Sequence, residues 1–302
     1  MKNLKVNIAG VELNNPVIAA SGTFGFGREY GEFYNLDELG AISVKGLTLN
    51  PREGNPPPRI AETYGGILNS VGLQNPGVKA FITYELPELK KHSCKVIANM
   101  AGSTFEDYYE MAEILSDSDV DMLEVNISCP NVRSGGVAFG TNASTIYEIT
   151  KGIKKYAKKP VIIKLSPNVT DIGEMAVAAE QGGADAISLI NTLLGMAIDI
   201  NSRKPILANV KGGFSGPAVK PVAVRMVYEA KNKVKVPIIG MGGITTGDDA
   251  VEFMIAGASA VMVGTANFMN PYACPDVKKG ILAYMDKYNI EDVNSIVNTV
   301  QL

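Results

Sequence analysis

The sequence predicts an α/β protein built as a single (β/α)₈ TIM barrel with a short N-terminal β-hairpin. Eight short apolar runs, rich in β-branched residues and nearly continuous, recur along the chain as strands buried on both faces would. Amphipathic helical stretches lie between most of these runs, which favours a closed barrel over the alternative of an open doubly wound sheet. The length of 302 residues is ordinary for one such barrel, so residues 1–302 are expected to form one domain.

The expected elements follow in order from the N-terminus. Residues 4–14 alternate polar and apolar side chains around Ala9-Gly10, which predicts the hairpin. Strands are expected at residues 16–20, 41–45, 95–99, 122–128, 160–164, 186–191, 236–240 and 260–264. The clearest amphipathic helices are expected at residues 107–115, 172–181, 221–231 and 248–256.

Two connections are too long to be plain loops. One runs from residue 48 to about residue 95, and the other runs from residue 192 to residue 217. Both follow the carboxyl end of a strand, where barrels place their active sites. We therefore expect both insertions to build over the site.

The composition excludes several classes of protein. The formal net charge is −3, whereas a nucleic-acid-binding surface needs a basic stripe. Cys94, Cys129 and Cys274 stand far apart, which excludes a disulfide framework and an iron–sulfur cluster held by this chain alone, and fits a reduced cytoplasmic compartment. His92 is the single histidine, so histidine triads and two-histidine metal sites are excluded, and we expect it on the surface. The N-terminal stretch has neither the apolar core of a signal peptide nor the length of a membrane span.

Lysines and glycines mark the expected strand ends. Lys45 and Lys164 each close an apolar run, and a buried ammonium is costly unless it is paired. One such lysine could simply reach solvent at the rim, but two at equivalent positions favour an anionic or electron-rich ligand. Residues 240–243 (Gly-Met-Gly-Gly) and 263–265 (Val-Gly-Thr) end the seventh and eighth strands, where barrels bind phosphate through backbone N–H groups. Together they predict a phosphate-bearing ligand.

Asparagines and one cysteine complete the candidate site. The carboxamide of asparagine offers an acceptor and a donor in one plane, which matches the edge of a cyclic imide or ureide, although asparagine also caps strand ends. Cys129 follows a buried strand and precedes a glycine-rich run, so it is a candidate for proton transfer or nucleophilic attack, unlike Cys94 and Cys274, which we expect to be inert. The asparagines at this face are Asn69, Asn99, Asn126, Asn131 and Asn191.

Five motifs together resemble the dihydroorotate dehydrogenase family, from the hairpin to about Cys274. They are residues 126–131 (Asn-Ile-Ser-Cys-Pro-Asn), 69–73 (Asn-Ser-Val-Gly-Leu), 20–22 (Ala-Ser-Gly), 190–192 (Ile-Asn-Thr) and 241–243 (Met-Gly-Gly). The chain is most similar to the catalytic subunit of the NAD-linked class, on residues 25–30, 135–140 and 240–243.

The resemblance implies a flavoprotein of de novo pyrimidine biosynthesis with one FMN at the barrel mouth and no metal. FMN would contact Ser21, Lys45, Gly46, Asn99, Asn126, Lys164, Ile190 and Gly216, with its phosphate on Gly242, Gly243, Gly264 and Thr265. Dihydroorotate would be held by Lys45, Asn69, Ser70, Val71, Gly72, Leu73, Asn126, Asn191 and Thr192. Cys129 would act as the general base, and the glycine-rich residues after it suggest a lid.

The resemblance also implies a partner, because this chain has no second flavin motif and no cysteine cluster for passing electrons to NAD. A second subunit with FAD and a 2Fe-2S cluster would supply the relay, in a heterotetramer around a dimer of this chain. One alternative is the fumarate-reducing class of the same family, which needs no partner. An RNA-modifying FMN barrel of the dihydrouridine synthase type is another, but it should carry a basic surface. A non-catalytic phosphate-binding barrel is a third, and it leaves Cys129 and the two lysines unexplained.

Overall fold

Eight parallel strands close into a barrel, so the open-sheet alternative is wrong. This computed structural model describes residues 2–127 and 139–302. The strand order around the barrel is β10-β15-β16-β3-β4-β7-β8-β9, closing back on β10. The strands are β3 (Val17–Ala19), β4 (Ala41–Ser43), β7 (Lys95–Met100), β8 (Met122–Asn126), β9 (Val161–Lys164), β10 (Ala186–Leu189), β15 (Ile238–Met241) and β16 (Ala260–Val263).

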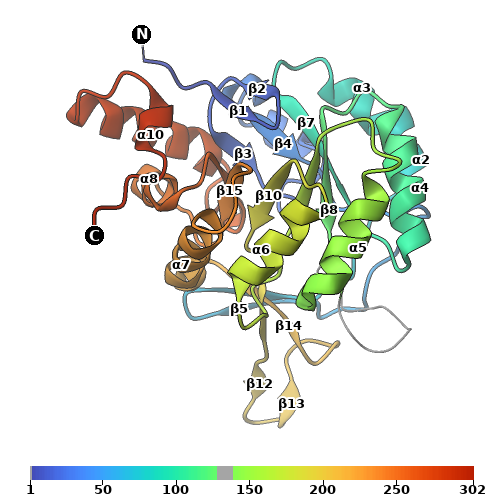
Figure 1. Cartoon of the computed structure of the whole chain (residues 1–302). Helices are drawn as coiled ribbons and strands as arrows, with labels where there is room; N and C mark the ends of the chain where they lie inside the picture. The colour runs from blue at the N-terminus through green and yellow to red at the C-terminus, as the bar shows by residue number, and fades with distance from the viewer. Residues whose placement is uncertain (1, 128–138) are drawn as a thin grey trace.

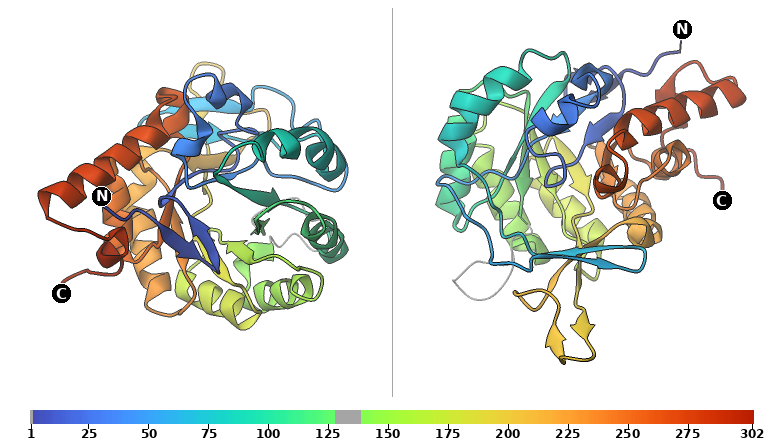
Figure 2. Two further views of the ribbon diagram at one scale, coloured as in Figure 1. Left: turned by 90° about the horizontal axis from the view of Figure 1, so that it is seen from above. Right: turned by 180° about the vertical axis from the view of Figure 1, so that it is seen from behind.

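Helices surround the strands, as Figure 2 shows from above. Residues with side chains that accept backbone hydrogen bonds start several of them: Thr104 and Thr246 each form a capping box with the aspartate three residues later. The long helices are α4 (Phe105–Ser116), α5 (Ala143–Ile153), α6 (Ile172–Gln181), α7 (Lys220–Lys231), α8 (Gly247–Ala256) and α10 (Ala273–Lys287). The short ones are α1 (Arg28–Gly31), α2 (Val78–Ala80), α3 (Leu86–Leu89) and α9 (Ala266–Met269), with further single turns at Leu36–Glu38, Phe81–Glu85, Phe139–Thr141, Pro217–Val219 and Val293–Ile296.

The main core lies inside the barrel and between the barrel and its helices. Ile18, Ile97, Ile163 and Phe253 are fully buried there. The nearly continuous apolar runs of the sequence therefore correspond to strands buried on both faces, as expected for a barrel.

The N-terminal hairpin is confirmed. Strand β1 (Val6–Ile8) pairs with β2 (Val11–Leu13), and Ala9 and Gly10 form the turn with positive φ angles of 53° and 87°. In Figure 1 the hairpin lies at the opposite end of the barrel from β5 and β14. It therefore covers the end that carries no predicted site residue.

The two long insertions pair with one another, which the sequence did not reveal. The first contributes β5 (Ile60–Thr63) and β6 (Gly66–Asn69), and the second contributes β11 (Leu193–Gly195) and β14 (Gly212–Ser215). They form one four-stranded antiparallel sheet in the order β11-β14-β6-β5. Between β11 and β14, the hairpin of β12 (Ile198–Asp199) and β13 (Lys204–Pro205) projects away from the barrel (Figure 1).

Several strands end earlier than predicted, and one difference affects the site. The expected strand at residues 41–45 ends at Ser43, because the N–H group of Lys45 donates to the carbonyl oxygen of Gly25 and not to a barrel strand. Lys164, in contrast, is the last residue of β9. The prediction that Lys45 and Lys164 occupy equivalent positions is therefore wrong. Among the described helices, none is long and apolar enough to cross a lipid bilayer.

Candidate functional site

A cavity of about 850 Å³ lies at the carboxyl ends of the barrel strands, beneath the four-stranded sheet. The two insertions thus build over this end, as predicted. Every predicted cofactor-binding or substrate-binding residue lines this one cavity: Ser21, Lys45, Gly46, Asn69, Ser70, Val71, Gly72, Leu73, Asn99, Asn126, Lys164, Ile190, Asn191, Thr192, Gly216, Gly242, Gly243, Gly264 and Thr265. Cys129, Asn131 and most of the proposed lid lie outside the described residues.

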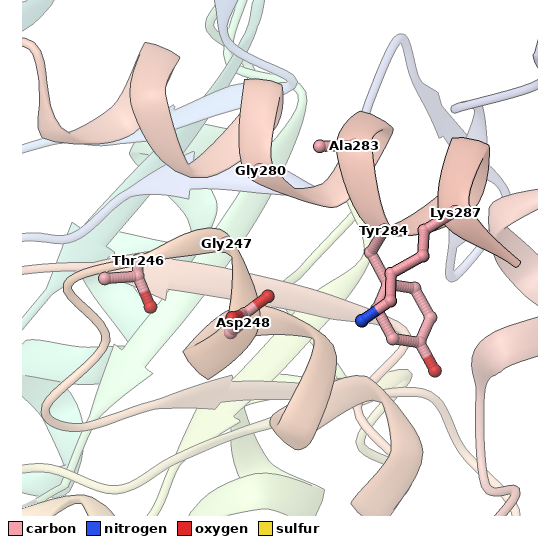
Figure 3. Close-up of a pocket in the computed structure, with 7 residues that line it drawn as sticks. All are labelled: Thr246, Gly247, Asp248, Gly280, Ala283, Tyr284 and Lys287. Carbon is pink, nitrogen blue, oxygen red and sulfur yellow. The ribbon is translucent and has the colours of Figure 1, made fainter.

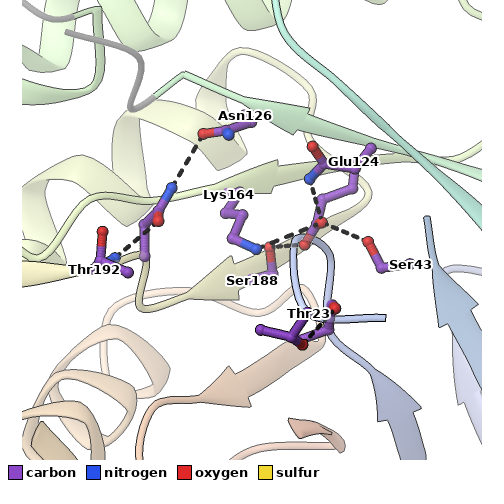
Figure 4. Close-up of polar contacts among 10 residues, drawn as sticks. Thr23, Ser43, Glu124, Asn126, Lys164, Ser188 and Thr192 are labelled. Atoms are coloured by element: carbon purple, nitrogen blue, oxygen red, sulfur yellow. Dashed lines mark hydrogen bonds and ion pairs between the residues drawn. The ribbon is translucent and has the colours of Figure 1, made fainter. Parts of the chain in front are cut away.

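A buried carboxylate, Glu124 of β8, organises the barrel side of the cavity (Figure 4). The Oγ atoms of Ser43 and Ser188 donate to it over 2.8 and 2.7 Å, and Nδ2 of Asn99 donates over 2.6 Å. Nζ of Lys164 lies 3.7 Å from Oε2 of Glu124. The side chains of Lys164 and Glu124 are 7% and 0% exposed, so this is a buried ion pair. Its desolvation cost is offset by the three further hydrogen bonds.

Lys45 has a different environment on the same cavity. Among the residues that the structure describes, none forms an ion pair with Lys45. Burial lowers the pKa of Lys45 from its usual 10.5, and the like charge of Arg59 lowers it further. An anion bound beside Lys45 would relieve both effects.

Two of the site asparagines, Asn126 and Asn191, are hydrogen-bonded to each other with fixed polarity. Nδ2 of Asn191 donates to Oδ1 of Asn126 over 3.1 Å, while Oδ1 of Asn191 accepts from the backbone N–H of Thr192 over 2.8 Å. The backbone oxygen of Asn126 accepts from the hydroxyl of Tyr108 over 2.7 Å. These contacts hold the amide planes at the carboxyl ends of β8 and β10, on either side of β9, where a flat heterocycle could contact them.

Two polar atoms on the cavity wall are left without a partner. Within the described chain, Oδ1 of Asn99 and Oγ of Ser70 are buried and make no hydrogen bond. Asn99 is 1% exposed, and its Nδ2 is already committed to Glu124, so its oxygen is fixed as an acceptor. Buried polar atoms are nearly always satisfied, so these two atoms are available to a molecule that enters the cavity.

Glycines shape the part of the cavity beyond β15 and β16. Gly242 and Gly243 have positive φ angles of 126° and 79°, which favour glycine. A Cβ atom at Gly243 would lie 2.9 Å from the carbonyl oxygen of Gly216, whereas one at Gly264 would meet nothing closer than 3.6 Å. Nearby, the hydroxyl of Thr265 donates to Oγ of Ser215 over 2.8 Å. This glycine-lined end suits the backbone-mediated binding of a phosphate.

Sequence reasoning missed the residues that hold these side chains in place. Ser43, Glu124 and Ser188 were not among the predicted site residues, although each lies in an apolar strand and is fully buried. A charged residue inside such a strand was the available signal, because glutamate is almost never fully buried without partners. Ser166 and Asn168, which follow β9, also line the cavity.

The remaining candidate groups lie elsewhere. Cys94 and Cys274 are buried free thiols, and burial raises the pKa of each to about 12, so both are inert as expected. His92 is partly exposed and lies 3.6 Å from Asp37, away from the cavity. Within residues 2–127 and 139–302, no cluster of histidine, cysteine, aspartate or glutamate could hold a metal ion.

A second, shallower hollow lies outside the barrel, between the start of α8 and α10 (Figure 3). The two helices approach closely at glycines that line it: a Cβ atom at Gly247 would lie 2.3 Å from the Cα atom of Gly280. Asp248 and Lys287 are at its rim. It has no buried polar group that lacks a partner, so we assign no function to it.

Comparison with known proteins identifies the family of the chain. A sequence profile described as dihydroorotate dehydrogenase matches residues 3–285. The catalytic subunits of dihydroorotate dehydrogenase B (NAD(+)) from Alkaliphilus metalliredigens and Alkaliphilus oremlandii are 66% and 64% identical, over 97% and 98% of both chains. The subunit of the same name from Thermoanaerobacter pseudethanolicus is 59% identical over 99% of both chains. A crystal structure of DHODH from Eimeria tenella in complex with ferulenol shares the fold, with a TM-score of 0.80 at 23% identity, covering 98% of this chain and 88% of the other. The chain belongs to the dihydroorotate dehydrogenase family of oxidoreductases, among relatives that are catalytic subunits of the B (NAD(+)) form.

Proposed function

We propose that this chain oxidises dihydroorotate to orotate in pyrimidine biosynthesis, with FMN as the hydride acceptor and Cys129 as the general base. One observation carries the proposal. A single cavity at the carboxyl end of the barrel gathers Lys45, Lys164, a set of oriented amides and a glycine-lined end in a chain of this family. In this proposal residues 1–302 act as one FMN-binding unit.

The residues present fit FMN. The cavity volume of about 850 Å³ lies in the range of cofactor sites, roughly 300–1,000 Å³. The unpartnered Oδ1 of Asn99 and the Lys164 ammonium would face the polar ring of the flavin, and Ser21, Gly46, Asn126, Ile190 and Gly216 would line it. A Cβ atom at Gly46 would lie 3.0 Å from Oδ1 of Asn99, so glycine keeps this approach open. Gly242, Gly243, Gly264 and Thr265 would hold the phosphate.

The substrate would lie between the flavin and the inserted sheet. Lys45 would pair with the carboxylate of dihydroorotate, because unlike Lys164 it has no carboxylate partner among the described residues, and unlike Lys211 it is not exposed. The amides of Asn69, Asn126 and Asn191 would contact the alternating C=O and N–H groups of the ring. The segment Ser70, Val71, Gly72 and Leu73, together with Thr192, would close the remaining sides.

The chemistry divides between the protein and its cofactor. Cys129, which follows β8 in the sequence, would remove a proton from C5 of dihydroorotate. When bound, FMN supplies the acceptor for the hydride that leaves C6. A thiol has a pKa near ~8.5 in water, so we expect the rate of oxidation to rise toward alkaline pH. The glycine-rich residues after Cys129 would close over the site and exclude water.

A partner subunit would carry electrons onward. The curated relatives are each named a catalytic subunit of an NAD(+) enzyme, which favours the NAD-linked form over the fumarate-reducing one. We propose an electron-transfer subunit with FAD and a 2Fe-2S cluster, joined to a dimer of this chain in a heterotetramer located in the cytoplasm. If the purified chain alone reduced NAD with dihydroorotate, no such partner would be needed. Membership of this family speaks against the RNA-modifying alternative.

The experiment that tests the base is a single-turnover measurement. FMN-loaded wild type, Cys129→Ala and Cys94→Ala are mixed with dihydroorotate without oxygen, and loss of flavin absorbance is followed. Cys129→Ala should retain FMN and react about 10²–10⁴-fold more slowly, the usual effect of losing a general base. Cys94→Ala, which removes a buried thiol outside the cavity, is the matched control and should react at close to the wild-type rate. A Cys129→Ala variant that reacted as fast as Cys94→Ala would contradict the assignment.

A further inference from the structure

Glu124 does not line the cavity, yet it contacts two residues that do. It joins β8 to four other barrel strands, through Ser43 of β4, Asn99 of β7, Lys164 of β9 and Ser188 of β10. Each of these side chains is at least nine-tenths buried. The site residues predicted from the sequence do not include Glu124. A fully buried carboxylate next to a ligand cavity needs a structural or functional explanation.

The charges of Glu124 and Lys164 offset each other. Its three hydrogen-bond donors, two hydroxyls and one amide, are neutral. Among the described residues, Lys164 is the sole cation within ion-pair distance of it. An ionised carboxylate accepts hydrogen bonds and donates none, which matches a group surrounded by donors. The Glu124–Lys164 pair therefore has no net charge.

The distances show what the pair leaves available. Nζ of Lys164 lies 3.7 Å from Oε2, which is close enough for charge compensation and too long for a hydrogen bond. The N–H groups of Lys164 are thus not used up by Glu124 and can donate into the cavity that Lys164 lines. Asn99 offers an acceptor to the cavity where Lys164 offers donors. Nδ2 of Asn99 donates to Glu124, which leaves the unpartnered Oδ1 of Asn99 as the acceptor.

We propose that Glu124 is a positioning residue that sets the electrostatics of the bound flavin through Lys164 and Asn99. It cancels the charge of Lys164 while leaving its donors available, and it fixes which atom of Asn99 accepts. The side of the cavity formed by Lys164 and Asn99 is then polar and carries no net charge. This inference rests on the proposed function, since it requires FMN in the cavity.

The test is the variant Glu124→Gln, which removes the carboxylate charge and keeps the shape of the side chain. In Glu124→Gln, Lys164 would be an uncompensated cation beside the flavin, which stabilises the extra negative charge of reduced flavin. We expect the equilibrium constant for two-electron reduction to rise about tenfold or more, which is about 30 mV in midpoint potential. Sulfite, an anion that adds to N5 of oxidised flavins, should bind more tightly by a similar factor of about ten.

Ser43→Ala is the matched control. It removes one hydrogen bond to Glu124, retains the carboxylate and alters no residue that lines the cavity. A residue that merely supports the fold would affect both variants alike, by weakening FMN binding without moving the potential. The proposal therefore predicts a shifted potential in Glu124→Gln and a potential near that of wild type in Ser43→Ala.

A second variant covers the case in which Glu124→Gln does not fold. Glu124→Gln/Lys164→Met removes both charges, and replacing both partners of a buried pair is often well tolerated. Its reference is Lys164→Met, which also lacks the Lys164 donors and differs only in keeping the Glu124 carboxylate, so sulfite should bind about tenfold more tightly to the double variant than to Lys164→Met. Equal sulfite affinity in Lys164→Met and in the double variant, or an unchanged potential in FMN-loaded Glu124→Gln, would overturn the proposal. A wild-type chain that binds no FMN would instead contradict the proposed function.

Discussion

Lys45 and Lys164 line the same cavity but differ in whether a protein carboxylate compensates their charge. Lys164 ends β9 and is paired with Glu124. Lys45 lies two residues beyond β4 and has Arg59 as the charged group acting on it. The first lysine is compensated by the protein itself, while the second is left to be compensated by a ligand. In the proposed function the neutral flavin ring meets the compensated lysine, and the anionic substrate meets the uncompensated one.

The difference shows that a lysine at a strand end does not by itself identify the ligand. What matters is whether a carboxylate already neutralises it, because only an uncompensated cation favours an anion strongly. The following predictions test this contrast.

The largest effect is expected when the buried pair is broken. Lys164→Met leaves Glu124 as an uncompensated buried carboxylate, so the FMN-free protein should lose about 3–5 kcal/mol of unfolding free energy. Denaturant unfolding measures this loss. The matched control is Glu124→Gln/Lys164→Met, which should recover much of it. A double variant no more stable than the single one would show that the carboxylate is not what destabilises Lys164→Met.

An intermediate effect is expected on ligand affinity at Lys45. Lys45→Met should weaken orotate binding about 10- to 100-fold, because a charged hydrogen bond is worth about 1.5–3 kcal/mol. Perturbation of the flavin spectrum during an orotate titration gives the dissociation constant. Lys211→Ala, which removes an exposed lysine from the same cavity, is the control and should change affinity less than about threefold. Equal losses in both variants would mean that general positive charge attracts orotate, and not Lys45 in particular.

The smallest effect concerns the pH dependence of stability. Since burial lowers the pKa of Lys45, the folded, ligand-free protein binds fewer protons than the unfolded chain between this lowered pKa and the usual 10.5. The unfolding free energy contributed by this site therefore increases as pH rises through that window. Ligand-free Lys45→Met should be more stable than wild type at neutral pH, and the gap should narrow as pH approaches 10.5.

Thermal unfolding of both proteins across this pH range checks the sign. A gap that widened with pH would mean that the ammonium of Lys45 is stabilised in the folded state, contrary to its environment in the cavity.

The sequence was sufficient for the fold and for bringing the predicted cofactor-binding and substrate-binding residues of the described chain to one cavity. Continuous apolar strands that alternate with helices are typical of a barrel. In a barrel of parallel strands, the carboxyl ends of all the strands lie at one end. Lys45, Lys164, Gly242 and Gly264 could therefore be brought to one site without knowing any distance. The motif resemblance added the residues of the inserted segments, such as Asn69.

The sequence was not sufficient for contacts between distant segments. Glu124 meets Ser43 and Ser188 across 81 and 64 residues of chain, and nothing local to position 124 names those partners. The pairing of β6 with β14 is of the same kind, because backbone hydrogen bonds between insertions carry little side-chain signature. The prediction that Lys45 and Lys164 are equivalent was wrong because the sequence does not show that Lys164 pairs with the distant Glu124.

The most direct test of the account is an anaerobic titration of the purified, FMN-loaded chain with dihydroorotate, followed by its visible spectrum. The account predicts that the flavin absorption band bleaches in proportion to added dihydroorotate until one equivalent per chain is reached, and that orotate appears in equal amount. A chain that fails to bind FMN, or a bound flavin that stays oxidised in excess dihydroorotate, would contradict it.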